Sequence, residues 1–381
     1  MQNNFPFDAT PADPGRLDAW LRLAFADGIG PVAARRLLAA FGLPGQIWQA
    51  QFSALCAVVS PRQAATLLAP PSGRQRERME ATLDWLQTPG RAVVTLADAA
   101  YPAALLNIPD PPLLLYVRGD AALLSAPALA VVGSRHATVQ GRAHAMRFSE
   151  ELSHAGLSIV SGLAMGIDAA AHEGGLRGAG STVAVIGTGC DIDYPSRNRE
   201  LAERIAQGGC IVSEYALGTP PLSANFPRRN RVISGLAQAV LVVEAAARSG
   251  SLITARMAAE QGRDVFAIPG SIHAPLSKGC HQLIRQGAKL VETTQDILEE
   301  LPLRQAVAGI AQAQAAAGQL PDDDDPASLL VMRAMGHDPV DVDTLVQRCG
   351  LDAAALAAIL LGLELQGRVE VLPGAHYRYV A

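Results

Sequence analysis

The sequence predicts an α/β fold whose central part is a doubly wound parallel β-sheet. In that part of the 381-residue chain, short apolar and β-branched runs alternate with stretches of helical composition. This order is typical of parallel strands joined by crossover helices. The stretches before and after it read mainly as helices, which predicts flanking domains. Hydrophobic residues make up 49% of the chain, enough for about two to three domains to bury cores of their own.

Residues 1–90 are expected to form an N-terminal helical domain. The segment GIGPVAARRLLAAFG, which starts at Gly28, places a glycine hairpin between two apolar-periodic stretches, and Pro31 suits the first turn of the second. This resembles a helix-hairpin-helix (SAM-like) domain, with a degraded second copy around Ser60 and Pro61. Two interpretations stay open. Either the hairpin N–H groups approach a DNA phosphate, or, as the sequence favours, the helices only pack together.

Residues 91–302 are expected to carry the sheet. A proline-rich approach segment, Tyr101–Gly119, precedes it, and helices are expected at Gln140–Ala155 and Ser251–Gln261. Apolar runs mark the expected strands at Leu129–Val132, Leu157–Val160, Thr182–Ile186, Ile211–Val212, Val240–Val243, Val265–Ile268 and Leu290–Val291.

A linker and a small C-terminal domain are expected beyond the sheet. Residues 303–326 are low in complexity and end in an acidic run between two prolines. Residues 327–381 read as three helices and a hairpin through Pro373 and Gly374, an order that resembles a winged helix. Winged helices usually read DNA through basic residues of the third helix, but Asp352–Gln366 holds no Lys or Arg. With four arginines against six acids, a net of −2, this domain is expected to dock a partner or inhibit rather than bind DNA.

Charge and cysteine usage narrow the class of protein. The net charge of −5 argues against coating of DNA by the whole surface, although it is compatible with a local basic groove. The five cysteines include no CxxC pair, which predicts reduced thiols rather than disulfides or a zinc site. No stretch approaches the ~20 apolar residues of a membrane helix, and the N-terminus does not resemble a secretion signal. We therefore expect a cytoplasmic protein without metal, cofactor or membrane contact.

Small polar residues follow nearly every expected strand. Since the carboxyl ends of parallel strands share one sheet edge, these residues predict an anion site there. Gly187-Thr188-Gly189 has no third glycine opening a helix, so it is not a dinucleotide fingerprint, and no GxxxxGK[ST] motif occurs. Asp168 and His172, at i and i+4, are interpreted as a cap and a packed histidine rather than metal ligands. The strand ends are Gly133-Ser134-Arg135, Ser161-Gly162, Gly187-Thr188-Gly189, Ser213-Glu214, Glu244 and Pro269-Gly270.

The segment FPRRNR, from Phe226 to Arg231, is the strongest binding signal in the chain. Guanidinium groups match the geometry of phosphate, and an aromatic ring can stack on a base. Some of its arginines are expected to bond back to sheet-edge carbonyls or to acids such as Glu244, and at least one to face the ligand. For Phe226 two readings stay open, an exposed stacking ring and a plug under the sheet. Ser134 and Ser161 are read as hydroxyls that face an anion, because no base stands beside them to make either a nucleophile.

Taken together, the motifs resemble one family. SRxxT, SGLAMGIDAAAH, GTGCDIDYPSRNREL, SEY-LGTPP, FPRRNRVISGL, VVEAAARSGSLITA and IPGSI-----KGCHQLI-QGA occur in that order, and the combination resembles the DNA-processing protein DprA family, also called Smf. The resemblance implies an extended Rossmann-like domain and a homodimer that binds single-stranded DNA. It implies no enzymatic activity. The expected function is to protect incoming DNA and load RecA on it during natural transformation, helping RecA to displace single-strand-binding protein.

The resemblance also implies site residues, and a second hypothesis remains. The sheet is similar to that of lysine-decarboxylase-like phosphoribohydrolases, which would make the protein a nucleotide-processing enzyme. However, the comparable stretch Glu244–Thr254 lacks the PGG and the trailing glutamate of their loop. A pure scaffold is the third reading, and the arginine cluster argues against it. The DNA-binding residues implied are Gly133, Ser134, Arg135, Ser161, Gly162, Phe226, Arg229, Asn230, Arg231, Ser249, Gly250 and Thr254, with Ser251 in the same closing loop. Arg228 is added to these residues from the basic cluster itself.

Overall fold

The N-terminal part of the chain is helical. The computed structural model describes residues 14–301, 326–335, 340–351, 353–365, 368–372 and 376–379. The first helices pack around a core that includes Leu23, Leu37 and Leu67. Proline opens several of them, at the first turn where its missing N–H costs nothing. The helices are α1 (Pro14–Ala24), α2 (Pro31–Phe41), α3 (Pro44–Gln49), α4 (Phe52–Cys56), α5 (Pro61–Leu68) and α6 (Gly73–Leu86).

The two hairpins of this domain lie against each other. Gly28 has a φ of +76°, a conformation that favours glycine. Its carbonyl accepts a hydrogen bond of 2.9 Å from Nε2 of Gln63, in the first turn of α5. The main chain of Gln63 is in turn capped by the Ser60 hydroxyl at 3.3 Å. Both hairpins therefore form one paired unit, and contact with DNA there stays a prediction.

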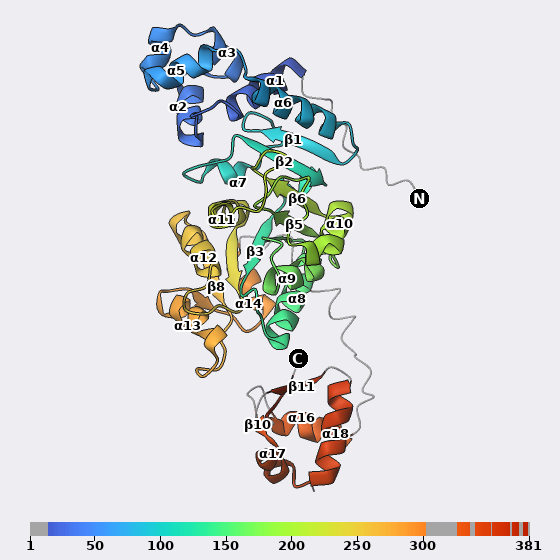
Figure 1. The fold of residues 1–381 in the computed structure, drawn as a ribbon. Coiled ribbons are helices and arrows are strands. Elements are labelled where there is room, and N and C mark those ends of the chain that lie inside the picture. The colour runs from blue at the N-terminus through green and yellow to red at the C-terminus, as the bar shows by residue number, and fades with distance from the viewer. Residues whose placement is uncertain are drawn as a thin grey trace.

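The middle of the chain forms a nine-stranded sheet in the order β1-β2-β6-β5-β4-β3-β7-β8-β9 (Figure 1). The strands from β3 onward pair in parallel, as predicted. β1 and β2 add an antiparallel edge that was not predicted. The prolines of the approach segment conceal β2, the strand that follows them. The strands are β1 (Arg91–Thr95), β2 (Leu114–Gly119), β3 (Ala128–Val132), β4 (Ser158–Ser161), β5 (Thr182–Val185), β6 (Cys210–Ser213), β7 (Ala239–Val242), β8 (Asp264–Ala267) and β9 (Lys289–Leu290).

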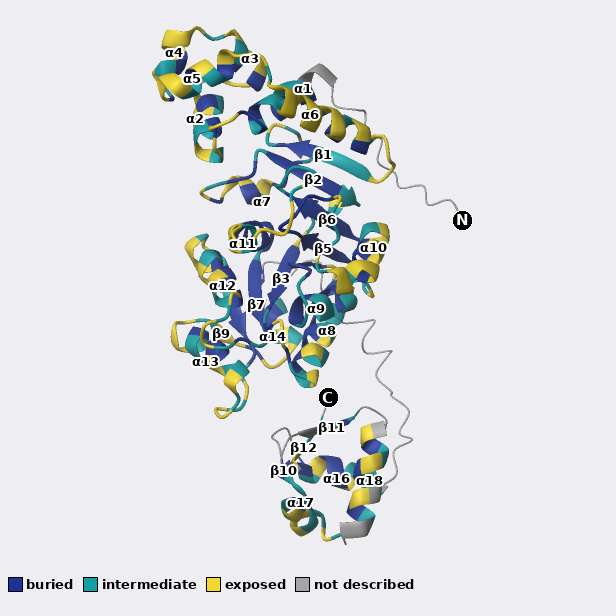
Figure 2. Cartoon of the chain, viewed as in Figure 1, coloured by how far each residue is buried: buried dark blue, intermediate teal, exposed yellow. Residues whose placement is uncertain are grey.

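Helices cover both faces of the sheet, so its central strands are buried (Figure 2). Ala130 and Val132 of β3 join one core with α7, α11, α12 and α13, whereas Leu129 and Val131 join another with α8, α9 and α14. Burial on both faces explains why the strands read as continuous apolar runs. The helices are α7 (Ala103–Leu106), α8 (Val139–His154), α9 (Ile167–Gly175), α10 (Arg199–Gly208), α11 (Asn225–Leu236), α12 (Ser251–Glu260), α13 (Lys278–Arg285) and α14 (Thr294–Leu298).

The winding of the sheet reverses between β3 and β7. From β3 the chain steps through β4, β5 and β6 in one direction, and α11 then returns it to β7, on the other side of β3. From β7 it proceeds to β8 and β9 in the opposite direction. Open α/β sheets bind ligands in the crevice outside such a reversal point. The loops after β3 and β7 therefore define where the site should lie.

The C-terminal residues form the predicted winged helix. α16 (Pro326–Met335), α17 (Val342–Cys349) and α18 (Ala353–Leu365) pack with a small sheet around Val331, Leu345 and Leu360. Strands β10 (Val340–Asp341), β11 (Val369–Leu372) and β12 (His376–Tyr379) pair in the order β10-β12-β11. The expected linker up to residue 325 and the turn at Pro373 and Gly374 lie outside the described residues. Within the described part of the chain, no helix is both long and apolar enough to span a membrane.

Candidate nucleic-acid interface

A hollow of about 640 Å³ opens at the reversal point of the sheet. The loop after β3 forms one side of it, α11 another, and the loop after β7 a third. The residues expected at the site that line it are Gly133, Ser134, Arg135, Phe226, Arg229, Asn230, Ser249, Gly250 and Thr254. Ser161, Gly162, Arg228 and Arg231 are not among its lining residues.

The loop after β3 presents Arg135 at the mouth of the hollow. A Cβ at Gly133 would lie 2.8 Å from the Glu244 carbonyl oxygen, so only glycine lets the two loops approach this closely. The Ser134 N–H donates to the same carbonyl at 2.7 Å, and the Ser134 hydroxyl accepts from the His136 N–H at 3.1 Å. These contacts fix the turn, while Arg135 is exposed. Because Arg135 forms no ion pair with any described residue, its guanidinium is available to an anion.

Helical geometry divides the FPRRNR cluster between two sides of α11. Phe226, Arg229, Asn230 and Ile233 line the hollow, at the i, i+3, i+4, i+7 spacing of one helix face. Arg228 is exposed outside the lining of the hollow. That spacing is visible in the sequence and was the signal that could have identified which arginines face the site.

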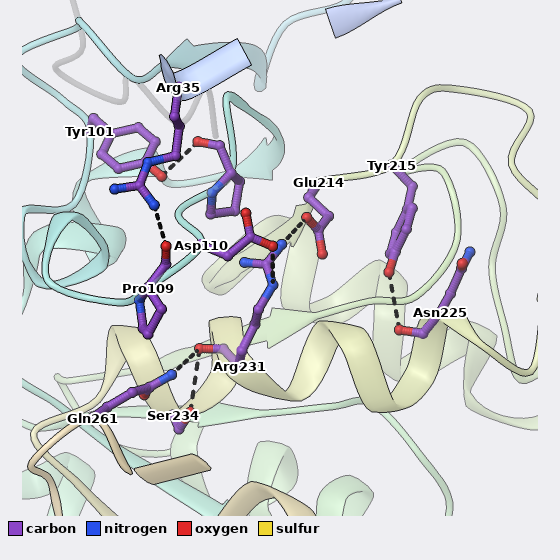
Figure 3. A network of polar contacts seen from close by, with 11 residues as sticks. Arg35, Tyr101, Pro109, Asp110, Glu214, Tyr215, Asn225, Arg231, Ser234 and Gln261 are labelled. Atoms are coloured by element: carbon purple, nitrogen blue, oxygen red, sulfur yellow. Dashed lines mark hydrogen bonds and ion pairs between the residues drawn. The ribbon is translucent and has the colours of Figure 1, made fainter. Parts of the chain in front are cut away.

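Arg231 joins an ion-pair network beside the hollow instead of lining it, contrary to its expected place along the DNA groove. Figure 3 shows its guanidinium between the carboxylates of Asp110 and Glu214. Nε lies 3.6 Å from Oδ2 of Asp110, and Nη2 donates to Oε2 of Glu214. Burial raises the pKa of Glu214, an effect that the charge of Arg231 opposes. The acids that engage this arginine are thus Asp110 and Glu214, not the expected Glu244.

The same network reaches the N-terminal domain. Nη1 of Arg35, on α2, donates to the Pro109 carbonyl, beside Asp110 (Figure 3). The backbone carbonyl of Arg231 accepts from Nε2 of Gln261 at 3.2 Å. The network therefore joins α2, the proline-rich segment, α11 and α12, which fixes the wall of the hollow from behind.

Arg229 lies beneath the hollow and bonds back to the sheet edge, as expected for some of these arginines. It is only 4% exposed, and its Nη1 donates to the Gly162 carbonyl at 2.8 Å and to that of Val185. Burial lowers the pKa of Arg229 to about 10, and the charge of Asp168 opposes this shift. Gly162 is needed here because a Cβ would lie 2.7 Å from both Arg229 Nη2 and Asp168 Oδ2.

Ser161 corrects another expectation. Its hydroxyl donates to the Val131 carbonyl at 2.6 Å, and the residue is fully buried between strands. It does not line the hollow, so its part is to tie β4 to β3. A serine at a strand end can turn inward as easily as outward, and the sequence alone does not distinguish the two directions.

Asp168 and His172 hold the loop after β4. His172 is a packed histidine, as predicted, but Asp168 does not cap α9, whose N-cap is Gly166, and bonds to the loop before the helix instead. Oδ2 of Asp168 accepts from the N–H groups of Gly162 at 3.2 Å and Ala164 at 3.4 Å. Nε2 of His172 accepts from the Leu163 N–H at 3.2 Å, and Nδ1 lies 2.7 Å from the Thr182 hydroxyl. Burial, and then the charge of Arg229, lower the pKa of His172 to about 3, so the ring is neutral in the folded protein.

This neutral histidine predicts an acid-sensitive fold. Below pH 6.5 the unfolded chain binds a proton at His172 that the folded chain does not, so stability falls with pH down to about pH 3. Between pH 6.5 and pH 5 the free energy of unfolding should fall by about 2 kcal/mol less in His172→Gln than in wild type. Denaturant unfolding at both pH values measures this, with exposed His154→Gln as the control. An unchanged pH dependence in His172→Gln would contradict the assignment.

The loop after β7 closes the remaining side of the hollow. The hydroxyls of Ser249 and Ser251 lie 2.6 Å apart, and Thr254 is buried at the start of α12. Glu244, which precedes this loop, accepts from the Thr138 N–H at 2.9 Å and the Thr138 hydroxyl at 2.6 Å. Its carboxylate thus caps α8 rather than facing the hollow. Across the described residues, no group of three or more His, Cys, Asp or Glu side chains is placed to hold a metal ion.

Two aromatic rings meet at the mouth of the hollow. Phe226 is half-buried, and its ring centroid lies 5.6 Å from that of Tyr194 at an interplanar angle of 36°. The Arg135 guanidinium carbon lies 5.8 Å from the Phe226 centroid. Phe226 therefore matches neither of the two readings fully, because its ring is half-buried against its neighbours and also lines the hollow. Tyr194 was missed, although an aromatic residue in the loop after a GTG strand end is a signal for it.

Comparisons with known proteins agree with this geometry. The family model of DNA recombination-mediator protein A matches residues 92–302, and a DprA winged helix domain model matches residues 314–375. Protein Smf of Escherichia coli (strain K12) is 41% identical over 340 residues, which cover 87% of this chain and 89% of that protein. DNA processing protein DprA of Streptococcus pneumoniae is 50% identical over 206 residues, 54% of this chain and 73% of that protein.

Solved structures give the same result. The X-ray structure of DNA processing protein A from Streptococcus pneumoniae superposes with a TM-score of 0.64 at 40% identity, over 74% of this chain and 96% of that one. A structure of DNA processing protein A from Helicobacter pylori, described for its unique single-stranded DNA binding mode, superposes with a TM-score of 0.50 at 32% identity. That match covers 54% of this chain and 94% of the other. The chain therefore belongs to the DNA recombination-mediator protein A (DprA/Smf) family.

Proposed function

We propose that this protein binds single-stranded DNA in the hollow at the reversal point of the sheet, without catalysing a reaction. The observation that carries the proposal is that Arg135, exposed and without an ion pair to any described residue, meets the rings of Tyr194 and Phe226 over a floor of small polar residues. Guanidinium groups neutralise phosphates, and rings stack on bases of any sequence. The Helicobacter pylori relative is described as a single-stranded DNA binder, which supports the proposal.

The proposed role is to protect incoming DNA and load RecA on it during natural transformation, which places the protein in the cytoplasm. The test is the rate of RecA filament assembly on DNA coated with single-strand-binding protein. Wild type should accelerate assembly, and Arg135→Ala should not. If wild type binds single strands but leaves the assembly rate unchanged, the loading role is wrong while the binding site stands.

A nucleotide-processing enzyme is the alternative, and the site offers little to support it. The only acid in the comparable loop, Glu244, caps α8. Asp168 lines the hollow, but its carboxylate is engaged by two backbone N–H groups of the loop after β4. Release of free base from a nucleoside monophosphate by the purified protein would favour this alternative over the proposal.

A homodimer is also part of the proposal. Ile272 and Leu290, 67% and 43% exposed, border one apolar depression beside β9, the edge strand of the sheet. Exposed apolar surface of this kind marks interaction sites, and a second copy of the chain would cover it. Sedimentation velocity should give twice the mass of one chain, and a single-chain mass would contradict the dimer.

The winged helix is predicted to contribute no DNA affinity. α18, which corresponds to the reading helix of DNA-binding winged helices, holds only apolar residues, one glycine and one glutamate. A chain that ends at residue 302 should therefore bind single-stranded DNA as tightly as the full chain, measured by fluorescence anisotropy at equal salt. A clear loss of affinity on truncation would assign DNA contacts to this domain.

A further inference from the structure

The two rings at the mouth of the hollow differ in how much surface they leave free. A Cβ built on Gly187 would lie 3.0 Å from Cδ1 of Phe226, so the Phe226 ring rests against this glycine. Tyr194 and Arg135 approach the same ring, with centroid distances of 5.6 and 5.8 Å. Phe226 is thus enclosed by three neighbours. Tyr194, in contrast, is 44% exposed.

The space behind the rings is far smaller than the hollow itself. A cleft of about 60 Å³ lies between Tyr194, Phe226, Arg135 and the loops after β4 and β5. The hollow, at about 640 Å³, is the larger space by far, so a base is expected in the hollow rather than behind the rings. Both rings line the hollow, and of the two Tyr194 leaves the more exposed surface for stacking.

We propose that Tyr194 is the residue on which a base of the bound strand stacks, and that Phe226 is a positioning residue that holds the Tyr194 ring. This rests on the proposed function, because it names the base-stacking surface of the same site. Gly187 positions Phe226, Phe226 supports Tyr194, and Arg135 stands beside them to contact the adjoining phosphate. Stacking on a ring is tolerant of base identity, so the strand is held without sequence preference.

The test separates base stacking from phosphate contact by using the full-length protein and two strands of equal length. One is oligothymidylate and the other is an abasic strand with the same phosphates. Tyr194→Leu should weaken binding of oligothymidylate by about 5- to 140-fold and leave binding of the abasic strand unchanged. Tyr194→Phe should rescue the loss. Phe226→Leu fills the space over Gly187 and should cost less than Tyr194→Leu. The control is Leu106→Ala, at an apolar side chain 51% exposed on α7, outside the hollow.

Several results would overturn the assignment. One is a Tyr194→Leu variant that binds oligothymidylate as tightly as wild type. Another is a Phe226→Leu variant that loses more oligothymidylate affinity than Tyr194→Leu does, which would make Phe226 the stacking residue. Arg135→Ala distinguishes this failure from failure of the proposed function. If Arg135→Ala weakens both strands while Tyr194→Leu weakens neither, only the stacking assignment is wrong. If wild type binds neither strand, the proposed function fails and the stacking role fails with it.

Discussion

Replacing Arg231 by Met is expected to lower the free energy of unfolding by about 3–5 kcal/mol, because it leaves the buried Glu214 carboxylate, and the partly exposed Asp110 carboxylate, without their partner. Arg231 is 9% exposed between Asp110 and Glu214. Oε1 of Glu214 and Nη1 of Arg231 have no hydrogen-bond partner among the described atoms, so the network is only partly satisfied and tolerates no further loss. Chemical denaturation at pH 7 measures the change.

Arg228→Met is the matched control for this prediction. It removes the same side chain from the same helix, but Arg228 is exposed, and surface substitutions usually change stability by less than about 0.5 kcal/mol. Adding Glu214→Gln to Arg231→Met should recover part of the loss, since an amide costs less to bury than an unpaired carboxylate. Wild-type stability in Arg231→Met together with weakened DNA binding would place this arginine in the DNA groove after all.

Replacing Arg135 by Ala is expected to weaken binding of every single-stranded sequence alike, because phosphate contacts carry no sequence information. The slope of log affinity against log salt should become shallower by about 0.7, because one phosphate of the strand is then no longer neutralised by the protein. Arg135→Lys should recover the slope better than the affinity, since lysine keeps the charge but not the planar fork.

The control is Arg147→Ala, which removes an equal charge from an exposed ion pair on α8. It should change neither the affinity nor the salt slope. An unchanged slope in Arg135→Ala would mean that the phosphate lies elsewhere.

Much of the fold can be predicted from the sequence because the parallel strands are buried on both faces. Such strands appear as short apolar runs, and the runs at β3, β4, β5 and β7 needed no other information. The antiparallel edge was missed because β2 follows the proline-rich IPDPP segment, and prolines normally argue against a strand. The site's location followed from the strand ends, since topology alone brings them to one edge.

Which side chains face the hollow was harder to predict. In FPRRNR the answer depends on the phase of α11, and one residue of shift would exchange the roles of Arg228 and Arg229. Arg229 and Arg231 are buried by partners that lie far away in sequence, Gly162 and Asp110 among them. Tyr194 becomes part of the site only because its loop meets α11 in space. Contacts of this kind come from tertiary packing, which local patterns do not contain.

The central claim is that the hollow at the sheet reversal is a site for single-stranded DNA. The most direct measurement is the affinity of the full-length protein for single- and double-stranded DNA of the same length, across a series of salt concentrations. At the mouth of the hollow an arginine lies beside two aromatic rings, and only unpaired bases can reach those rings. We expect clear preference for the single strand at every salt concentration, and loss of that preference in the double variant Arg135→Ala/Tyr194→Leu. Equal affinity for both forms, or a preference that survives the double variant, would contradict the claim.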